Sequence, residues 1–118
     1  LTPVTKGTPQ ASTTLAVVAT DATLTKAGAK RLAIMAQTGL SRALYPVHTP
    51  LDGDVVFAAA TGRKPAPDPT VGLSEIGTAA ANCLARAVAR GVYEAAALPF
   101  PGALPAWRDR FARGNGQS

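Results

Sequence analysis

The chain has 118 residues, enough for one domain or part of one, and 47% of them are hydrophobic. Alanine supplies much of that fraction and aromatic residues only 5%, which favours close-packed helices and an apolar surface meant for a partner. The net charge is +5, but Lys and Arg are scattered without interleaved aromatics, so an acidic partner subunit explains the charge better than nucleic acid does.

The first half of the chain predicts a linker, a strand and a helix. Residues 1–12 hold two prolines, a glycine and several hydroxyl residues, and are predicted to form an exposed linker. The apolar run 15–20 contains β-branched residues and predicts a strand buried on both faces. Thr25 is predicted to cap a helix that runs to about Leu44, before Pro46. The apolar positions of this helix recur every three or four residues: Leu32, Met35, Ala36, Leu40, Ala43 and Leu44.

The second half repeats this order. Residues 55–61 predict another buried strand, and a loop with two prolines follows it. A second helix is predicted from position 71 or 73 to 97. Its inner stripe is rich in small residues, so another element can approach its backbone closely: Leu73, Ile76, Gly77, Ala80, Ala81, Leu84, Val88, Gly91, Val92 and Ala95.

The order strand, helix, strand, helix predicts an α/β fold that is incomplete. Two strands make no stable sheet with helices unless further strands come from elsewhere. The predicted organisation is a linker over 1–12, a core over 13–97 and a proline-rich tail over 98–118. Within the tail, the four-residue spacing of Trp107 and Phe111 predicts one last helical turn, whereas the final residues from Gly114 onward are expected to be disordered.

Cysteine and methionine use give two further expectations. Cys83 is the only cysteine, which excludes an internal disulfide and any Cys-x-x-Cys motif and favours a cytoplasmic, reducing compartment. The chain begins at Leu1 and its only methionine is Met35, so we expect a processed product or a piece of a longer chain. No N-terminal targeting signal and no apolar run long enough for a membrane span is visible.

Hydroxyl side chains lead into the first predicted strand, and two carboxylates lead into the second. Ser12, Thr13 and Thr14 precede the first strand, whereas Asp52 and Asp54 flank a glycine before the second. A hydroxyl residue that becomes the first of a chain can use its own α-amine, with a pKa of about 8, as the base. Carboxylates can position and polarise such a nucleophile. The pattern therefore indicates an N-terminal nucleophile that needs no histidine.

Each of these residues also has a plainer interpretation. Hydroxyl residues commonly precede strands, and Asp-Gly is a common turn dipeptide. The aspartates could bind a divalent cation, but few oxygen ligands are visible and no calcium-loop pattern follows. His48 stands between two prolines and is interpreted as structural, and Cys83 as a small core residue. If the carboxyl groups of Asp52 and Asp54 lie close together, one of them should have a raised pKa unless cations compensate.

Several motifs with preserved spacing resemble a single family. They are 13–21, 24–27, 30–33, 46–54, 56–58 and 60–62. Over about 13–97 the chain resembles the L-aminopeptidase/D-amidase-esterase family of self-processing hydrolases, which includes the β-peptidyl aminopeptidases and the endo-type nylon oligomer (6-aminohexanoate oligomer) hydrolases. Its motifs are most similar to those of the nylon oligomer hydrolase branch.

The resemblance implies a precursor that cuts itself into a larger N-terminal α subunit and a small β subunit, of which this chain is the nucleophile-bearing part. Thr13 would be the nucleophile, the bond between Ser12 and Thr13 the cleavage site, and Asp52 and Asp54 the acids near the hydroxyl. The implied fold is an α-β-β-α sandwich completed by the α subunit, and the αβ units assemble into larger homo-oligomers. No cofactor and no metal are expected.

The function so implied is hydrolysis of small peptides or linear amide oligomers. Further substrate-binding residues, and most of the oxyanion stabilisation, are expected in the α subunit. The alternative is an unprocessed, non-catalytic homologue that serves as a structural or binding half, in which Ser12 replaces the Asn or Gly common in the family and marks lost self-cleavage. A basic nucleic-acid-binding module is a weaker third interpretation, and no membrane partner is expected.

Overall fold

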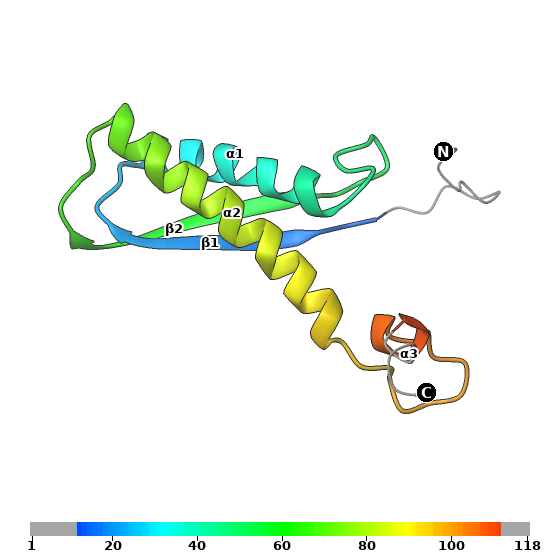
Figure 1. The fold of residues 1–118 in the computed structure, drawn as a ribbon. Helices are drawn as coiled ribbons and strands as arrows, with labels where there is room; N and C mark the ends of the chain where they lie inside the picture. Colours follow the sequence, from blue (N-terminus) through cyan, green and yellow to red (C-terminus); the bar gives the residue numbers. More distant parts are fainter. Residues whose placement is uncertain (1–11, 112–118) are drawn as a thin grey trace.

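The computed structural model describes residues 12–111 and confirms the predicted order of elements. The elements are β1 (Leu15–Ala22), α1 (Lys26–Ala43), β2 (Val55–Lys64), α2 (Val71–Glu94) and α3 (Trp107–Phe111) (Figure 1). Helix α3 is the last helical turn that the spacing of Trp107 and Phe111 predicted. Of the linker expected over 1–12 only Ser12 is described, and it is exposed but paired with Asp52. The expectation of disorder from 114 onward lies outside the described residues.

The two strands form a parallel sheet, with α1 as the connection between them. Leu15 pairs with Val55, and this register holds as far as Thr20 and Ala60. Parallel neighbours need such a crossover because the chain must return to the same end of the sheet. Both α1 and α2 lie on one side of the sheet (Figure 1). The chain is therefore of mixed α/β type with a small parallel sheet.

The helices form where the local signals predict them. The hydroxyl of Thr25 accepts a hydrogen bond of 3.0 Å from the N–H of Gly28 and so caps α1. Leu32, Ala36 and Leu40, all from the predicted apolar stripe, are buried. These side chains lie against the sheet and α2 and make up the centre of the core, together with Ala16, Val18, Val56 and Leu84.

Helix α1 approaches the small residues of α2 closely, as the small-residue stripe predicted. A Cβ atom at Gly77 would collide with the side chain of Met35, and one at Gly39 would collide with the backbone of Ala81. Helix α2 ends at Glu94, three residues before the predicted end. Its last turns extend past the sheet (Figure 1), where they bury little and gain no packing free energy from a further turn.

The opposite face of the sheet is bare in the described part of the chain. Leu15 and Val17 of β1 are 71% and 68% exposed, and Phe57 of β2 is 58% exposed. The prediction that the first strand is buried on both faces is therefore wrong for residues 12–111, because both helices cover the same face. Isolated exposed apolar side chains are ordinary, whereas here several of them share one face of the sheet.

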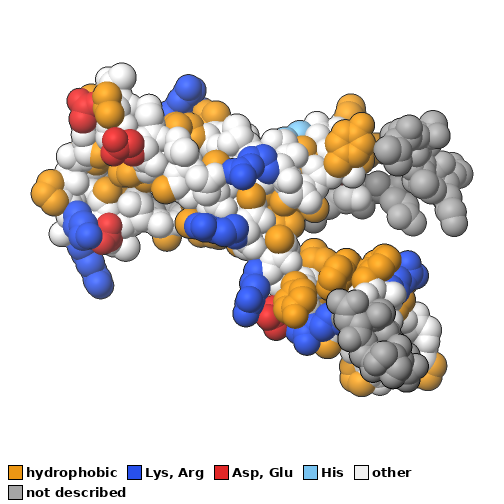
Figure 2. Space-filling view, in the orientation of Figure 1, with side chains coloured by type: hydrophobic (Ala, Val, Ile, Leu, Met, Phe, Trp, Pro, Cys, Tyr) orange, Lys and Arg blue, Asp and Glu red, His pale blue; other side chains and the backbone are white. Residues whose placement is uncertain are grey.

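Charged side chains are spread over the molecule. Lys and Arg do not gather into a single patch on the face shown in Figure 2. Some are paired, as Lys64 is with Asp21 at 3.4 Å and Arg90 with Glu94 at 3.0 Å. Within residues 12–111, no helix is both long and apolar enough to cross a membrane.

Candidate active site

The hydroxyl segment and the carboxylate segment run side by side, although they are about forty residues apart in sequence. Ser12 forms a parallel bridge with Asp52. The N–H of Ser12 donates to the carbonyl of Leu51 at 3.1 Å, and the N–H of Gly53 donates to the carbonyl of Ser12 at 2.6 Å. The ladder of β1 and β2 thus continues backwards through both segments. Strand pairing is what brings the candidate residues together.

Thr13 lies directly against Gly53. A Cβ atom added to Gly53 would come within 2.9 Å of the Thr13 hydroxyl oxygen, which is closer than real Cβ atoms approach. The Thr13 side chain is exposed and its hydroxyl makes no hydrogen bond within residues 12–111. Sequence reasoning treated Gly53 only as part of an Asp-Gly turn, whereas the structure shows that its missing side chain leaves room for the Thr13 hydroxyl.

The Asp54 side chain is shielded from solvent and accepts two backbone hydrogen bonds. One carboxylate oxygen accepts from the N–H of Thr14 at 3.0 Å. The other accepts from the N–H of His48 at 3.0 Å and lies 3.2 Å from the imidazole Nδ1 of the same residue. The Asp54 side chain is only 4% exposed. Asp54 therefore ties the loop before β2 to the residue that follows Thr13.

These donors lower the pKa of Asp54. The backbone hydrogen bond from His48 is the largest cause, burial works against it, and the N–H and hydroxyl of Thr14 and the charge of the His48 imidazole act in the same lowering direction. The expectation that a carboxyl of this pair has a raised pKa is thus wrong for Asp54. Hydrogen bonds to the ionised form outweigh burial at this position.

Asp52 has different partners from Asp54. Its carboxylate accepts from both the N–H and the hydroxyl of Thr49, each at 2.9 Å, while its own N–H donates to the Thr49 carbonyl at 2.9 Å. Asp52 therefore closes the turn that leads into β2. Within the described residues, the side-chain hydrogen bonds of both aspartates go to Thr49, His48 and Thr14 rather than to Thr13.

His48, which the sequence analysis interpreted as structural, contacts Asp54 in this site. It has φ of 58°, a left-handed conformation that is uncommon for residues other than glycine. This conformation lets its backbone N–H and its imidazole face the same oxygen of Asp54. The signal in the sequence was that the only histidine lies six residues before Asp54.

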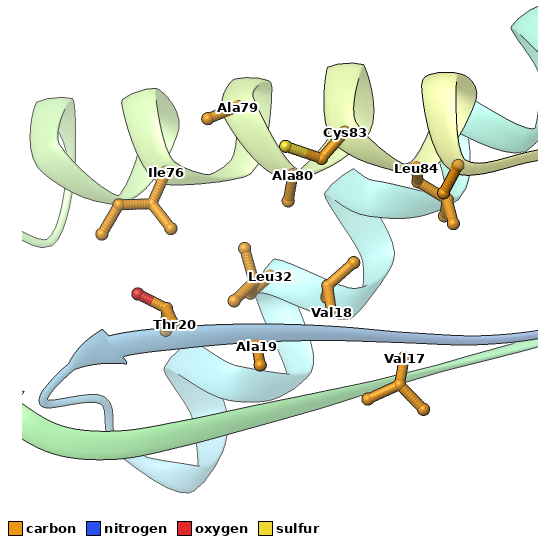
Figure 3. Close-up of a pocket in the computed structure, with 11 residues that line it drawn as sticks. Val17, Val18, Ala19, Thr20, Leu32, Ile76, Ala79, Ala80, Cys83 and Leu84 are labelled. Atoms are coloured by element: carbon orange, nitrogen blue, oxygen red, sulfur yellow. The ribbon is translucent and has the colours of Figure 1, made fainter. Parts of the chain in front are cut away.

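No other part of the described chain offers a comparable set of groups. Residues 12–111 contain no cluster of three or more His, Cys, Asp or Glu side chains that could hold a metal ion. A hollow of about 390 Å³ lies between β1 and α2, but it is lined almost entirely by apolar side chains (Figure 3). Val18 and Leu32 point into it from below, and Cys83 stands at its α2 wall (Figure 3). The hollow is a packing surface, and the polar site lies at the start of the strands.

Comparison with known proteins gives a family and several relatives that match most of the chain. The sequence profile of "Peptidase family S58" matches residues 2–103. Proteins from Mycobacterium bovis and Mycobacterium tuberculosis, both named as uncharacterized aminopeptidases, are each 46% identical over 111 aligned residues, which cover 85% of this chain and 31% of each relative. A Mycobacterium leprae protein with the same description is 48% identical, over 79% of this chain and 31% of its own length. The chain thus spans about a third of the length of the curated relatives it matches.

Proposed function

The chain belongs to peptidase family S58, and from this membership we propose that it is the nucleophile-bearing part of a self-cleaving amide hydrolase. Thr13 is the nucleophile, and the bond between Ser12 and Thr13 is the one that the protein cuts in itself. The names of the mycobacterial relatives favour an aminopeptidase activity. Small peptides are therefore the first substrates to consider, and linear amide oligomers such as those of 6-aminohexanoate the second.

The observation that carries this proposal is the position of the bond between Ser12 and Thr13. The Ser12 carbonyl is held by the N–H of Gly53, and the Thr13 hydroxyl lies over the same glycine. The carbonyl that would be attacked is held by this residue, and the hydroxyl that would attack it lies beside the same residue. Placing two reacting groups side by side removes part of the entropy cost of the reaction.

Self-cleavage then needs only groups of the chain and one water molecule. The Thr13 hydroxyl oxygen bonds to the Ser12 carbonyl carbon, the bond from that carbon to the Thr13 nitrogen breaks, and the hydroxyl proton passes to the nitrogen. Water hydrolyses the resulting ester and returns a proton to the Thr13 oxygen. The freed α-amine, with a pKa of about 8, can take the hydroxyl proton when a substrate amide is attacked.

The carboxylates support this reaction without a hydrogen bond to the Thr13 hydroxyl in the described residues. Asp54 holds Thr14 and the loop residue His48, whereas Asp52 holds the turn at Thr49. Both lie in the single segment that runs alongside Thr13, so their negative charge favours the ammonium that forms when the Thr13 amine takes a proton. We assign them the roles of positioning the strand ends and of stabilising that charge.

The rest of the protein completes the fold in this proposal. The bare sheet face, with Leu15, Val17 and Phe57 exposed, supports an α-β-β-α sandwich in which an N-terminal α subunit from the same precursor covers that face. Further substrate-binding groups belong to that subunit, and the αβ units form homo-oligomers. The relatives, about three times as long as the stretch they share with this chain, leave room for such a subunit.

Intact-mass measurement and N-terminal sequencing of the full-length protein test the proposal. We expect a small fragment that begins with Thr13, followed by Thr14 and Leu15. The cut protein should hydrolyse an alanyl 4-nitroanilide, and a 6-aminohexanoate oligomer serves as the comparison substrate. A full-length protein that stays uncut and inactive would contradict the proposal and favour the non-catalytic structural half.

Variants of His48 test whether this residue positions Asp54. His48→Gly suits the left-handed backbone but removes the imidazole, so we expect self-cleavage to slow by about tenfold, the size of one lost charge-assisted hydrogen bond. His48→Asn tolerates the same backbone conformation and keeps a side-chain donor, and it should recover most of the rate. The measurement is the rate of fragment appearance by mass spectrometry, with melting curves of both variants as the control. Equal rates of self-cleavage in the wild type and in His48→Gly would show that the imidazole does not position Asp54.

A further inference from the structure

We infer that the backbone N–H of Gly53 is an oxyanion donor of this site, which first polarises the Ser12 carbonyl during self-cleavage and then the acyl carbonyl of each substrate. This inference rests on the proposed function. It differs from the expectation that oxyanion stabilisation comes mainly from the α subunit, because it places one donor within this chain.

The geometry at Ser12 is that of an acyl group already bound. The Gly53 N–H donates to the Ser12 carbonyl at 2.6 Å, and the Ser12 N–H donates to the Leu51 carbonyl at 3.1 Å. These two bonds hold Ser12, the residue that supplies the acyl group, through its N–H on one side of the Cα atom and its carbonyl on the other. A donor that already lies at hydrogen-bond distance needs no rearrangement when negative charge develops on the oxygen, which is the condition for strong oxyanion stabilisation.

The same oxygen atom carries the acyl group in both reactions. During self-cleavage the Thr13 hydroxyl oxygen becomes esterified by the Ser12 acyl group, and during turnover it becomes esterified by the substrate's acyl group. That oxygen lies over Gly53, at 2.9 Å from the position of a Cβ atom there. A substrate acyl group on this oxygen starts from the same atom as the Ser12 acyl group, so the same N–H is within reach of its carbonyl. Release of Ser12 then leaves this donor free for a substrate.

The bond from Gly53 is one of a series of ladder hydrogen bonds, so its catalytic role must be separated from its structural one. The next bond of the series, from the N–H of Val55 to the carbonyl of Thr14 at 2.9 Å, provides the comparison. Both bonds join the same two segments. Only the one from Gly53 reaches the carbonyl of the bond that is cut.

The test replaces a single backbone N–H by an ester oxygen in the full-length precursor. Cell-free translation with glycolic acid at position 53 removes the Gly53 N–H without adding an atom, and α-hydroxyisovaleric acid at position 55 does the same to Val55. We expect self-cleavage to slow by about a hundredfold or more with the ester at 53, the usual cost of one lost oxyanion donor. The ester at 55 should change the rate by only a few-fold.

The outcomes separate this inference from the function on which it rests. Equal slowing by the two esters, or no slowing by the ester at 53, would overturn the oxyanion role while leaving Thr13 as nucleophile. A wild-type protein that never cuts at Ser12–Thr13 would instead overturn the proposed function.

A side-chain variant tests the same geometry independently. Gly53→Ala keeps the N–H but places a Cβ atom against the Thr13 hydroxyl, so we expect cleavage to slow by about tenfold or more, in line with small displacements of reacting groups. Adding Thr13→Ser should restore part of the rate, because serine lacks the methyl group and its hydroxyl can rotate away. Gly91→Ala, where an added Cβ meets nothing within 4 Å, is the control. Wild-type cleavage by Gly53→Ala would contradict the placement of Thr13 over Gly53.

Discussion

We expect the full-length protein with Thr13→Ala to stay uncut between Ser12 and Thr13 and to lose its hydrolytic activity by about 10⁴-fold or more, the size of loss when a nucleophile is removed. Alanine has no oxygen that could take up the Ser12 acyl group, and a backbone nitrogen still in an amide cannot act as a base. Mass spectrometry of the purified protein reports the first effect, and hydrolysis of an alanyl 4-nitroanilide reports the second.

Thr14→Ala is the matched control for this variant. Thr14 stands next in the chain and keeps its N–H bond to Asp54 in the variant, but its hydroxyl lies on the Asp54 side of the strand rather than over Gly53. We expect it to be cut and active, with a rate within a few-fold of the wild type. Equal processing in the two variants would remove Thr13 from the role of nucleophile, and an uncut Thr14→Ala with a cut Thr13→Ala would transfer that role to Thr14.

Asp54→Asn has the second largest expected effect, a loss of roughly a hundredfold or more in self-cleavage and in turnover. The carboxylate accepts from two backbone N–H groups through different oxygens. An asparagine can accept through one of these atoms only, and its NH₂ group then faces an N–H donor. The change removes the negative charge and also loosens the hold on either Thr14 or His48. Asp52→Asn keeps an amide oxygen that can accept both bonds from Thr49 but loses the negative charge, and it should follow the same direction.

The structure also predicts a loss of stability for Asp54→Asn, since the side chain is buried rather than beside solvent. The pKa of Asp54 is lower in the folded state, so its contribution to stability is present above the ordinary aspartate pKa of about 4 and disappears as the pH falls through the folded-state value. Melting curves at pH 7 and below pH 4 should therefore show a smaller acid-induced loss of stability for the variant than for the wild type.

Asp68→Asn is the control that separates activity from stability. Asp68 also has a lowered pKa, because the N–H groups of Val71 and Thr70 donate to it at the start of α2. It lies outside the site, so its variant should share the changed acid response of melting and keep its turnover. Near-normal turnover in both Asp54→Asn and Asp52→Asn would reduce the acids to turn-forming residues.

The local sequence determined the elements of this chain. The Thr25 cap, the three- and four-residue spacing of Leu32, Ala36 and Leu40, and the small residues of α2 act over a few residues each, so they can be read without knowing what lies opposite. The candidate residues were visible for the same reason. A run of hydroxyl residues before one strand and Asp-Gly-Asp before the next stand out from their immediate neighbours.

The end of α2 and the burial of β1 could not be predicted in this way. Both depend on whether another element lies nearby, and a strand with apolar side chains on both faces has the same sequence whether one face is covered or both. Leu15 and Val17 satisfy the pattern of a fully buried strand, yet the helices reach only the other face. The pattern is that of a strand covered on both faces, whereas residues 12–111 cover only one of them.

The partners of the site residues were decided by tertiary structure alone. The sequence placed Asp52 and Asp54 together with Thr13, but the parallel register determines that Thr13 meets Gly53 while Asp54 meets Thr14 and His48. A shift of one residue in that register would exchange these contacts, because side chains alternate between the two faces of a strand. Residue types and spacing therefore determined which groups belong to the site. The pairing of two segments forty residues apart decided which atoms meet, because no local signal encodes a contact over that separation.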